Sequence, residues 1–397
     1  MNKTFQFVRH SLVELTRWFF SVIIPVKKGK IILQSYPDYA DNSRAFSDYL
    51  IANTNYHLYW SVSNASTYSN TERITFIEKD GGGSLIEKIK FIYHTVSSQY
   101  LFSTHAAFFY ANGRKQSYIC LWHGAPLKKI AVLQNPANKN YLSNTTGLLC
   151  SSNYYVPIMA KCFGWDKERI IPIGIPRNDW LFKETKALEK LCITKDEQQK
   201  IIVYLPTFRK TSITSACDSN QDVYKIGKID FSSDDTLRQL NEYLTSIRVK
   251  LIVKPHPADP NQQEKIGYSN IIVLPHKRLV EQDVQLNQVL HYADALITDF
   301  SGVYIDYMVL DRPIGFVLSD LSEYTSNRGF LFDNPLEYMP GMPIYNETQF
   351  MQFCKDVSEN IDEYKTERER MRHIYNDYHD AYNCKRLAQY LGMQICD

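Results

Sequence analysis

Short runs of β-branched and aromatic residues alternate with helix-forming segments along the chain from residue 30 onward. Strands separated by helices in this way are typical of βαβ units, whose strands form a largely parallel sheet. The alternation runs through residues 30–163 and starts again at Ile201–Leu205. The sequence therefore predicts an α/β protein with two Rossmann-like, doubly wound domains, because 397 residues exceed what one compact core usually holds.

The expected elements can be placed from these runs. In the first half we expect strands at Lys30–Gln34, His57–Val62, Ile74–Glu78, Gln99–Phe102, Tyr118–Trp122 and Gly147–Cys150, with helices near 43–53, 84–96 and 154–163. In the second half we expect strands at Ile201–Leu205, Val249–Lys254, Ile271–Leu274, Ala295–Thr298 and Ile314–Val317, with helices near 234–246, 284–292 and 303–310.

The domain organisation follows from these two halves. Residues 29–182 are predicted to form the N-terminal domain and residues 201–346 the C-terminal domain, with a charged hinge at 183–200. Residues 347–397 are expected to form helices that pack back across the domains. Doubly wound domains bind ligands beyond the carboxyl ends of their strands, so we expect an active site in a cleft between the two.

The N-terminal segment 1–28 differs in character from the rest. Residues 1–30 carry six basic residues against Glu14 alone, a charge of +5, whereas the whole chain carries +2, which leaves about −3 for the remainder. Its uncharged run Trp18–Val26 is far shorter than the roughly 20 residues that span a membrane. We expect an amphipathic helix on an anionic membrane surface; the alternative is a helix docked on the protein's own core.

Several classes of protein lack support in this sequence. The basic charge is local, so no nucleic-acid partner is expected. The eight cysteines include no C-x-x-C pair, which gives no metal motif and no disulfide scaffold. P-loop, dinucleotide-binding, serine-hydrolase and zincin motifs are also absent from the sequence. No cleavable signal is recognisable, and we expect a peripheral protein on the cytoplasmic face of the plasma membrane.

Polar residues directly after a predicted strand are the candidates for chemistry. His123 follows one such strand, and an imidazole can accept a proton from a hydroxyl at neutral pH. Gly124 lets the backbone turn and approach a ligand, and Lys128 adds a cation. A single histidine is more often a surface or packing residue, but His256 occupies a similar place in the second half.

The second half offers three such loops. Lys254 and His256 flank a proline in a stiff segment that suits a phosphate, and Thr207 and Arg209 follow another strand. The alternative for Arg209 is an ordinary surface arginine. The turn Thr298-Asp299-Phe300-Ser301-Gly302 ends a strand and opens a helix, which favours an anion site; the alternative for Ser301 is helix capping alone.

Six motifs together resemble one family. W-H-G-A-P-L-K, G-I-P-R-N-D, Y-L-P-T-F-R, K-P-H-P, I-T-D-F-S-G and N-R-G-F-L-F-D occur in order within residues 122–341 and are similar to those of the CDP-glycerol glycerophosphotransferase family of teichoic-acid and capsule enzymes. The resemblance implies a glycosyltransferase-B-like architecture and a size nearest to the priming enzymes. It further implies CDP-glycerol or CDP-ribitol as donor substrate, no cofactor, and a lipid-linked glycan acceptor.

The same resemblance implies roles for individual residues. His123 would be the base on the acceptor hydroxyl, and His256 would act with Lys254 and Arg209 on the pyrophosphate. Thr298, Asp299, Ser301 and Gly302 would form the phosphate-binding turn, and Thr207 and Arg328 would also lie on the donor side. Arg177 and Asp179 would line or support the cleft, and Asn42 and Tyr39 would lie toward the acceptor.

Two departures from the family pattern bear on the donor. The usual T-D-Y-S-S stands here as Thr298-Asp299-Phe300-Ser301-Gly302, without one tyrosyl hydroxyl and without the second serine. A glycine still offers its N–H to a phosphate, so the site can survive while polyol recognition changes. A nucleotide-sugar glycosyltransferase of the same architecture and an inactive glycan- or nucleotide-binding module remain the alternatives.

Overall fold

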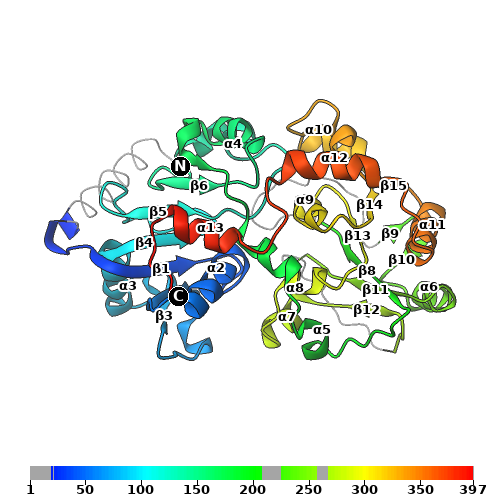
Figure 1. The fold of residues 1–397 in the computed structure, drawn as a ribbon, viewed down its shortest axis with the longest axis horizontal. Coiled ribbons are helices and arrows are strands. Elements are labelled where there is room, and N and C mark those ends of the chain that lie inside the picture. The colour runs from blue at the N-terminus through cyan, green and yellow to red at the C-terminus, as the bar shows by residue number, and fades with distance from the viewer. Residues whose placement is uncertain (1–18, 21, 208–224, 257–266, 397) are drawn as a thin grey trace. The chain divides into compact units, whose positions relative to one another are not determined.

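The structure is a computed structural model, and it describes residues 19–20, 22–207, 225–256 and 267–396. These residues form two compact units, each built on a parallel sheet with flanking helices (Figure 1). The prediction of an α/β fold with two parallel sheets is therefore confirmed. Of the segment 1–28, for which an amphipathic helix is predicted, residues 1–18 and 21 lie outside the described residues, and Lys27 and Lys28 already belong to β1.

The first unit covers Met1–His123, Ala131–Asp179 and Ala381–Asp397. Its seven strands follow the order β3-β2-β1-β4-β5-β6-β7, and all neighbours pair in parallel. The strands are β1 (Lys27–Gln34), β2 (Leu58–Val62), β3 (Ile74–Glu78), β4 (Ser98–Ser103), β5 (Ser117–Cys120), β6 (Gly147–Leu149) and β7 (Ile170–Ile171). The helices are α2 (Asp41–Asn53), α3 (Leu85–Ser97), α4 (Tyr155–Phe163) and α13 (Asn383–Tyr390).

The second unit covers Gly124–Ile130 and Trp180–Asp380. Its six-stranded parallel sheet has the order β12-β11-β8-β13-β14-β15. The strands are β8 (Lys200–Leu205), β11 (Val249–Val253), β12 (Ile271–Val273), β13 (Ala295–Thr298), β14 (Ile314–Val317) and β15 (Met342–Ile344), beside an antiparallel pair, β9 (Lys225–Ile226) and β10 (Ile229–Asp230). The helices are α5 (Ala187–Lys190), α6 (Asp234–Ser246), α7 (His276–Glu281), α8 (Leu286–Leu290), α9 (Val303–Tyr307), α10 (Leu321–Asn327), α11 (Glu347–Ser358) and α12 (Lys365–Tyr375).

Local signals explain where these elements begin and end. The Ser84 hydroxyl accepts a hydrogen bond from the Glu87 backbone at the start of α3, and the Asn346 side chain caps α11 in the same way. Gly164 ends α4 in the left-handed conformation that glycine tolerates. The central strands are apolar on both faces, as in β1, where Ile31, Ile32 and Leu33 are fully buried, because helices cover both sides of a parallel sheet.

The C-terminal helices divide between the units. Helices α11 and α12 belong to the second unit, whereas α13 belongs to the first unit and contacts α2 there. Residues 183–200 include α5 and lie in the second unit. The predicted segment boundaries, the hinge and the cleft stay predictions.

Candidate active site

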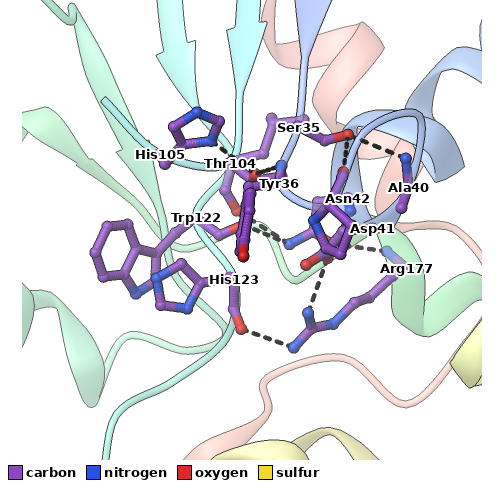
Figure 2. Close-up of polar contacts among 12 residues, drawn as sticks. Ser35, Tyr36, Ala40, Asp41, Asn42, Thr104, His105, Trp122, His123 and Arg177 are labelled. Atoms are coloured by element: carbon purple, nitrogen blue, oxygen red, sulfur yellow. Dashed lines mark hydrogen bonds and ion pairs between the residues drawn. The ribbon is translucent and has the colours of Figure 1, made fainter. Parts of the chain in front are cut away.

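His123 stands just after β5, where the chain turns sharply. The sequence predicts a strand that extends to Trp122, but β5 ends at Cys120. Trp122 has a φ of 52°, which is not compatible with extended backbone. The exposed imidazole of His123 stacks on the buried Trp122 indole with ring centroids 4.0 Å apart (Figure 2). The indole in turn packs edge-on against Phe163. Packing against Trp122 therefore orients the imidazole of an exposed residue.

A polar network centred on the buried Asn42 holds the backbone around His123. The side-chain amide of Asn42 donates to the carbonyls of Leu121 and Trp122 at 3.2 and 2.8 Å, and its oxygen accepts from the backbone N–H of Arg177 at 2.9 Å. Arg177 Nη2 donates to the His123 carbonyl at 2.8 Å. Figure 2 shows these groups converging on the loop. Asn42 is fully buried, so each of its hydrogen bonds supports the position of the loop.

Asp41 fixes Arg177 in this network. Its Oδ1 lies 2.8 Å from Arg177 Nη1, and both side chains are mostly buried. The same oxygen accepts from the backbone N–H of Asn42 at 2.6 Å. Arg177 and Asn42 thus hold the backbone of the loop that carries His123, and the roles expected for them at the cleft stay predictions.

His105 is a member of this cluster that sequence reasoning missed. It follows β4, and its Nε2 lies 3.3 Å from Nε2 of Gln34. Figure 2 shows His105 beside Thr104. Burial, and then the nearby Lys79 and His123, lower the pKa of His105 to about 4. It is therefore neutral at pH 7. Its place directly past a strand is the same signal that selected His123, and it could have been found in that way.

Tyr39 lies in an aromatic cluster. Its ring packs edge-on against Trp60, Tyr68 and Phe76 at centroid distances of 4.9–5.4 Å. The guanidinium of Arg44 stands 3.9 Å from the centroid of the same ring. These contacts give Tyr39 a packing role, and the predicted acceptor contact stays a prediction.

Asp179 holds the C-terminal helix. Its carboxylate accepts hydrogen bonds from the backbone N–H groups of Asn383 and Cys384 and from the Asn383 side chain, at 2.8–2.9 Å. These donors are the first residues of α13, where a negative charge is stabilised by the helix dipole. Asp179 is buried and supports the first unit through this helix.

In the second unit, Lys254, His256 and His276 gather beyond β11 and β12. The Lys254 ammonium is buried and donates to the Pro255 carbonyl at 3.1 Å, and burial lowers its pKa to about 8. His256 is exposed. Burial, followed by the charges of Lys254 and His256, lowers the pKa of His276 to about 4. The cluster therefore holds a buried cation beside a neutral histidine, and His276 is a second residue past a strand that the sequence reasoning missed.

The residues at the end of β13 join that strand to β8. Thr298 Oγ1 donates to the Leu205 carbonyl at 2.8 Å, and Asp299 accepts from the backbone and hydroxyl of Thr207 at 2.9 and 2.7 Å. Thr298 and Asp299 are buried, so these contacts shape the turn that follows. Ser301 is partly exposed at that turn, and its Oγ accepts from the Val303 N–H at 3.4 Å.

The turn is covered by the segment Gly124–Ile130, called here the connecting segment, which follows His123 in the chain. The backbone of Lys128 forms an antiparallel β-bridge with that of Phe330, and the Leu331 N–H donates to the Leu127 carbonyl at 2.9 Å. Gly124 has a φ of 119°, which only glycine adopts readily. A Cβ on Gly302 would lie 2.5 Å from the Ala125 carbonyl oxygen. The missing second serine is thus explained by this close approach.

The other departure from the family pattern has a different explanation. The ring of Phe300 is fully buried and packs against Tyr324 and Phe330. A tyrosyl hydroxyl at this position would enter a mainly aromatic environment. Arg328 is partly buried at the end of α10, and Arg209 lies outside the described residues.

The comparison with protein families decides which family the chain belongs to. The family model described as CDP-Glycerol:Poly(glycerophosphate) glycerophosphotransferase matches residues 16–392. The chain belongs to this family. All six motifs named above fall within the match, so the resemblance seen in the sequence is confirmed.

Relatives of this glycerophosphotransferase-family chain carry teichoic-acid names. It is 25% identical over 396 residues to the teichoic acid poly(glycerol phosphate) polymerase of Staphylococcus epidermidis, covering 92% of this chain and 50% of that one. It is 26% identical to the polymerase of the same name from Bacillus subtilis, and the match covers 84% of this chain and 45% of that one. It is 24% identical to the teichoic acid glycerol-phosphate transferase of Staphylococcus aureus, and the match covers 91% of this chain and 92% of that one. The chain spans about half the length of the first two relatives.

A solved structure in the family shares the fold. The structure of the wall teichoic acid polymerase TagF matches with a TM-score of 0.74 at 21% identity, covering 99% of this chain and 98% of that one. The family member described here therefore has a TagF-like fold of the glycosyltransferase-B type.

The described residues also bear on metal binding and membrane crossing. Among them, no group of three or more His, Cys, Asp or Glu side chains is placed to hold a metal ion. No helix within the described ranges has the length and apolar character that crossing a membrane requires.

Proposed function

We propose that the protein transfers glycerol phosphate or ribitol phosphate from a CDP-polyol donor to a hydroxyl of a lipid-linked glycan, releasing CMP. This reaction would serve teichoic acid or other surface polysaccharide synthesis. Family membership supports the reaction class. The matched relatives are named for both glycerol phosphate and ribitol phosphate, so the proposal keeps both donors.

The step is a displacement at phosphorus. The acceptor oxygen attacks the phosphorus that carries the polyol, the bond from that phosphorus to the oxygen of CMP breaks, and a phosphodiester forms. The proton of the acceptor hydroxyl passes to the His123 imidazole. General-base assistance of this kind contributes roughly 10²–10⁴-fold to the rate.

The observation that carries this role is the support of His123. His123 is exposed yet its ring stacks on a buried indole, and its carbonyl accepts a hydrogen bond from Arg177, which pairs with Asp41. A base fixed in this way keeps its orientation when an acceptor arrives, which reduces the entropy lost in reaching the transition state. A histidine of purely structural use would not need an exposed ring.

The donor phosphates are proposed to bind to the second unit. Lys254, with a pKa near 8, is mostly protonated at pH 7 and supplies a positive charge beside the exposed His256. Ser301 and the backbone N–H of Gly302 follow β13, which is separated from β11 by β8 in the same sheet. Arg209 is kept as a further cation of the proposal, although it lies outside the described residues. These groups would offset charge on the diphosphate as CMP leaves.

Product analysis tests the proposal directly. Purified full-length protein is incubated with CDP-glycerol or CDP-ribitol and a lipid-linked disaccharide, and the products are identified by mass spectrometry. We expect an acceptor heavier by one or more polyol phosphates, with CMP formed only when acceptor is present. Release of UDP or GDP from a nucleotide sugar would indicate the glycosyltransferase alternative, and tight CDP binding without turnover would indicate a binding module. Parallel reactions in EDTA test the expectation that no metal cofactor is needed.

We further propose that the protein works at the cytoplasmic face of the plasma membrane as a peripheral protein. A lipid-linked acceptor requires the enzyme to reach the bilayer surface. Phe19, Val22 and Ile23 have more than half of their side-chain surface exposed, and Lys27 and Lys28 follow them. Exposed apolar residues followed by lysines suit the headgroup region of an anionic membrane.

A further inference from the structure

Tyr36 is an exposed aromatic residue just beyond the carboxyl end of β1, an inner strand of the first sheet. The residue is 58% exposed. Its backbone is nevertheless held, because the Tyr36 N–H donates to Thr104 Oγ1 at 3.1 Å and the Ser35 hydroxyl donates to the Pro37 carbonyl at 2.7 Å. A fixed loop therefore presents the ring to solvent at the sheet edge where doubly wound domains bind their ligands.

A second tyrosine in the same loop provides a contrast. Tyr39 packs against three aromatic rings and the guanidinium of Arg44, so the fold itself uses that ring. The Tyr36 ring has an edge-type contact with the His105 ring, at a centroid distance of 6.5 Å and an interplanar angle of 78°. Single exposed aromatic residues are ordinary on a protein surface, and what distinguishes Tyr36 is its position relative to the proposed base.

Hydrogen bonds hold the Tyr36 loop and the His105 ring together. Gln34 is buried and its amide nitrogen can only donate, so the His105 Nε2 that lies 3.3 Å away accepts. A neutral His105 then carries its proton on Nδ1, which lies 3.3 Å from Thr104 Oγ1. The same Thr104 oxygen accepts from the Tyr36 N–H, so the Tyr36 backbone and the His105 ring share one anchor.

The anchored pair lies beside His123. Burial, followed by the charges of Lys79 and His123, lowers the pKa of His105 to about 4, so His123 is near enough to act on the His105 charge. In Figure 2 the Tyr36 ring extends from its loop toward His123. His123 is itself exposed, and stacking on Trp122 orients its ring. Two exposed aromatic residues in fixed positions, Tyr36 and His123, therefore lie at one edge of the first sheet.

We propose that the Tyr36 ring stacks on a sugar ring of the acceptor glycan and holds the acceptor hydroxyl beside His123. This inference rests on the proposed function and adds a residue that selects the acceptor. One face of a pyranose ring presents C–H groups with a slight positive charge, whereas the face of an aromatic ring is negative, so the two faces attract one another. Because the Tyr36 backbone is already fixed, stacking costs little conformational freedom and brings the sugar to the base in a defined orientation.

The same chemistry separates two kinds of acceptor end. An acyclic glycerol or ribitol chain offers no flat C–H face to an aromatic ring. Tyr36 should therefore contribute to binding of an acceptor that ends in a sugar, and it should contribute little to an acceptor that already ends in a polyol phosphate.

Equilibrium binding to the full-length protein tests the inference. Tyr36→Ala is compared with Tyr36→Phe, which keeps the ring, and with the control Tyr390→Ala, which removes a 56% exposed tyrosine elsewhere in the first unit. Isothermal titration gives the Kd for the lipid-linked disaccharide and, separately, for CDP-glycerol. We expect Tyr36→Ala to raise the disaccharide Kd roughly 5–30-fold, and Tyr36→Phe and Tyr390→Ala to leave it nearly unchanged. The Kd for CDP-glycerol should not change, because the donor is proposed to bind to the second unit.

Steady-state kinetics add a second measurement. In Tyr36→Ala, KM for the disaccharide should rise while kcat is largely kept, since the ring acts on binding and the base is still present. With a disaccharide that already carries one polyol phosphate, KM should be the same in Tyr36→Ala and in the unaltered enzyme.

Several results would overturn the inference. The first is no measurable binding of the disaccharide to the unaltered protein, or an unchanged disaccharide Kd in Tyr36→Ala. An equal loss in Tyr36→Phe would assign the effect to the hydroxyl, and an equal loss in Tyr390→Ala would assign it to a general change in the first unit. A raised Kd for CDP-glycerol alone would place the ring against the base of the donor. If the disaccharide binds through Tyr36 but no polyol phosphate is transferred, the proposed function fails while the stacking contact stands.

Discussion

The substitution Gly302→Ala tests whether the connecting segment matters for catalysis. Gly302 has a φ of −63°, so alanine suits its backbone and the only obstacle is space. The added Cβ would lie 2.5 Å from the Ala125 carbonyl oxygen, whereas ordinary contacts begin at 3.4 Å. Either the turn after β13 or the connecting segment must therefore move by about half an ångström to one ångström.

The size of the effect follows from what the connecting segment joins. Its far end pairs with residues 329–331, so it cannot yield freely there, and its near end begins directly after His123. Overpacking of this kind costs about 1–3 kcal/mol of folding free energy. A displacement near 1 Å at a reacting group can lower the rate roughly 10²-fold. We expect kcat to fall by about 10–10²-fold in Gly302→Ala.

A matched control separates catalysis from stability. A Cβ on Gly341, before β15 in the same unit, would lie 2.2 Å from the Ile314 carbonyl oxygen. Gly341→Ala should lower the melting temperature as Gly302→Ala does, while kcat of the folded enzyme stays near that of the unaltered protein. Initial rates of CMP release at saturating CDP-glycerol, with thermal unfolding curves, give both quantities. A folded Gly302→Ala enzyme with unchanged kcat, or an equal loss in both variants, would refute the reasoning.

Four further substitutions probe the remaining assignments. His123→Ala should lower kcat roughly 10²–10⁴-fold, and loss of CDP-glycerol affinity in equilibrium binding would contradict its role as base. The Kd for CDP-glycerol should rise above about pH 8, where the buried Lys254 loses its proton, and Lys254→Arg should remove this dependence. Asp179→Ala should cost about 2–4 kcal/mol in urea unfolding by leaving helix N–H groups of α13 without an acceptor; an unchanged midpoint would argue against that cap. Burial lowers the pKa of His94 from 6.5 to about 4, so the unfolded chain takes up a proton at a higher pH than the folded protein does. The free energy of unfolding should therefore fall as the pH drops from 6.5 to 4, and it should fall less steeply in His94→Gln. Urea midpoints that change equally in both proteins between about pH 7 and pH 5 would disprove this.

The long elements were predictable because their patterns are local. The helices expected at 84–96, 154–163 and 234–246 differ from α3, α4 and α6 by about one residue at either end. The short edge strands β7 and β15 escaped prediction, since two or three residues carry little periodicity and pair only where a neighbouring strand is present. The α7 helix was missed for a similar reason: its six residues follow Pro275 without a strong apolar repeat.

For the candidate site too, local features could be predicted and long-range contacts could not. The rule that polar residues after strands matter found His123 and His256, and applied more widely it would have found His105 and His276. Partners far away in the chain could not be foreseen: Asp179 meets α13 some 204 residues later. The close approach of Ala125 to Gly302 likewise depends on tertiary packing alone.

The contact between Asp179 and α13 has a consequence for how the protein is made. The first unit includes residues 381–397, which are synthesised after the second unit's residues 180–380, so the first unit cannot finish folding before those residues have been made. Until Asn383 and Cys384 emerge, the Asp179 carboxylate lacks the helix donors that it meets in the finished fold. A nascent chain stopped at residue 380 would carry the whole sequence of the proposed catalytic machinery and yet remain without the helix that completes its first unit.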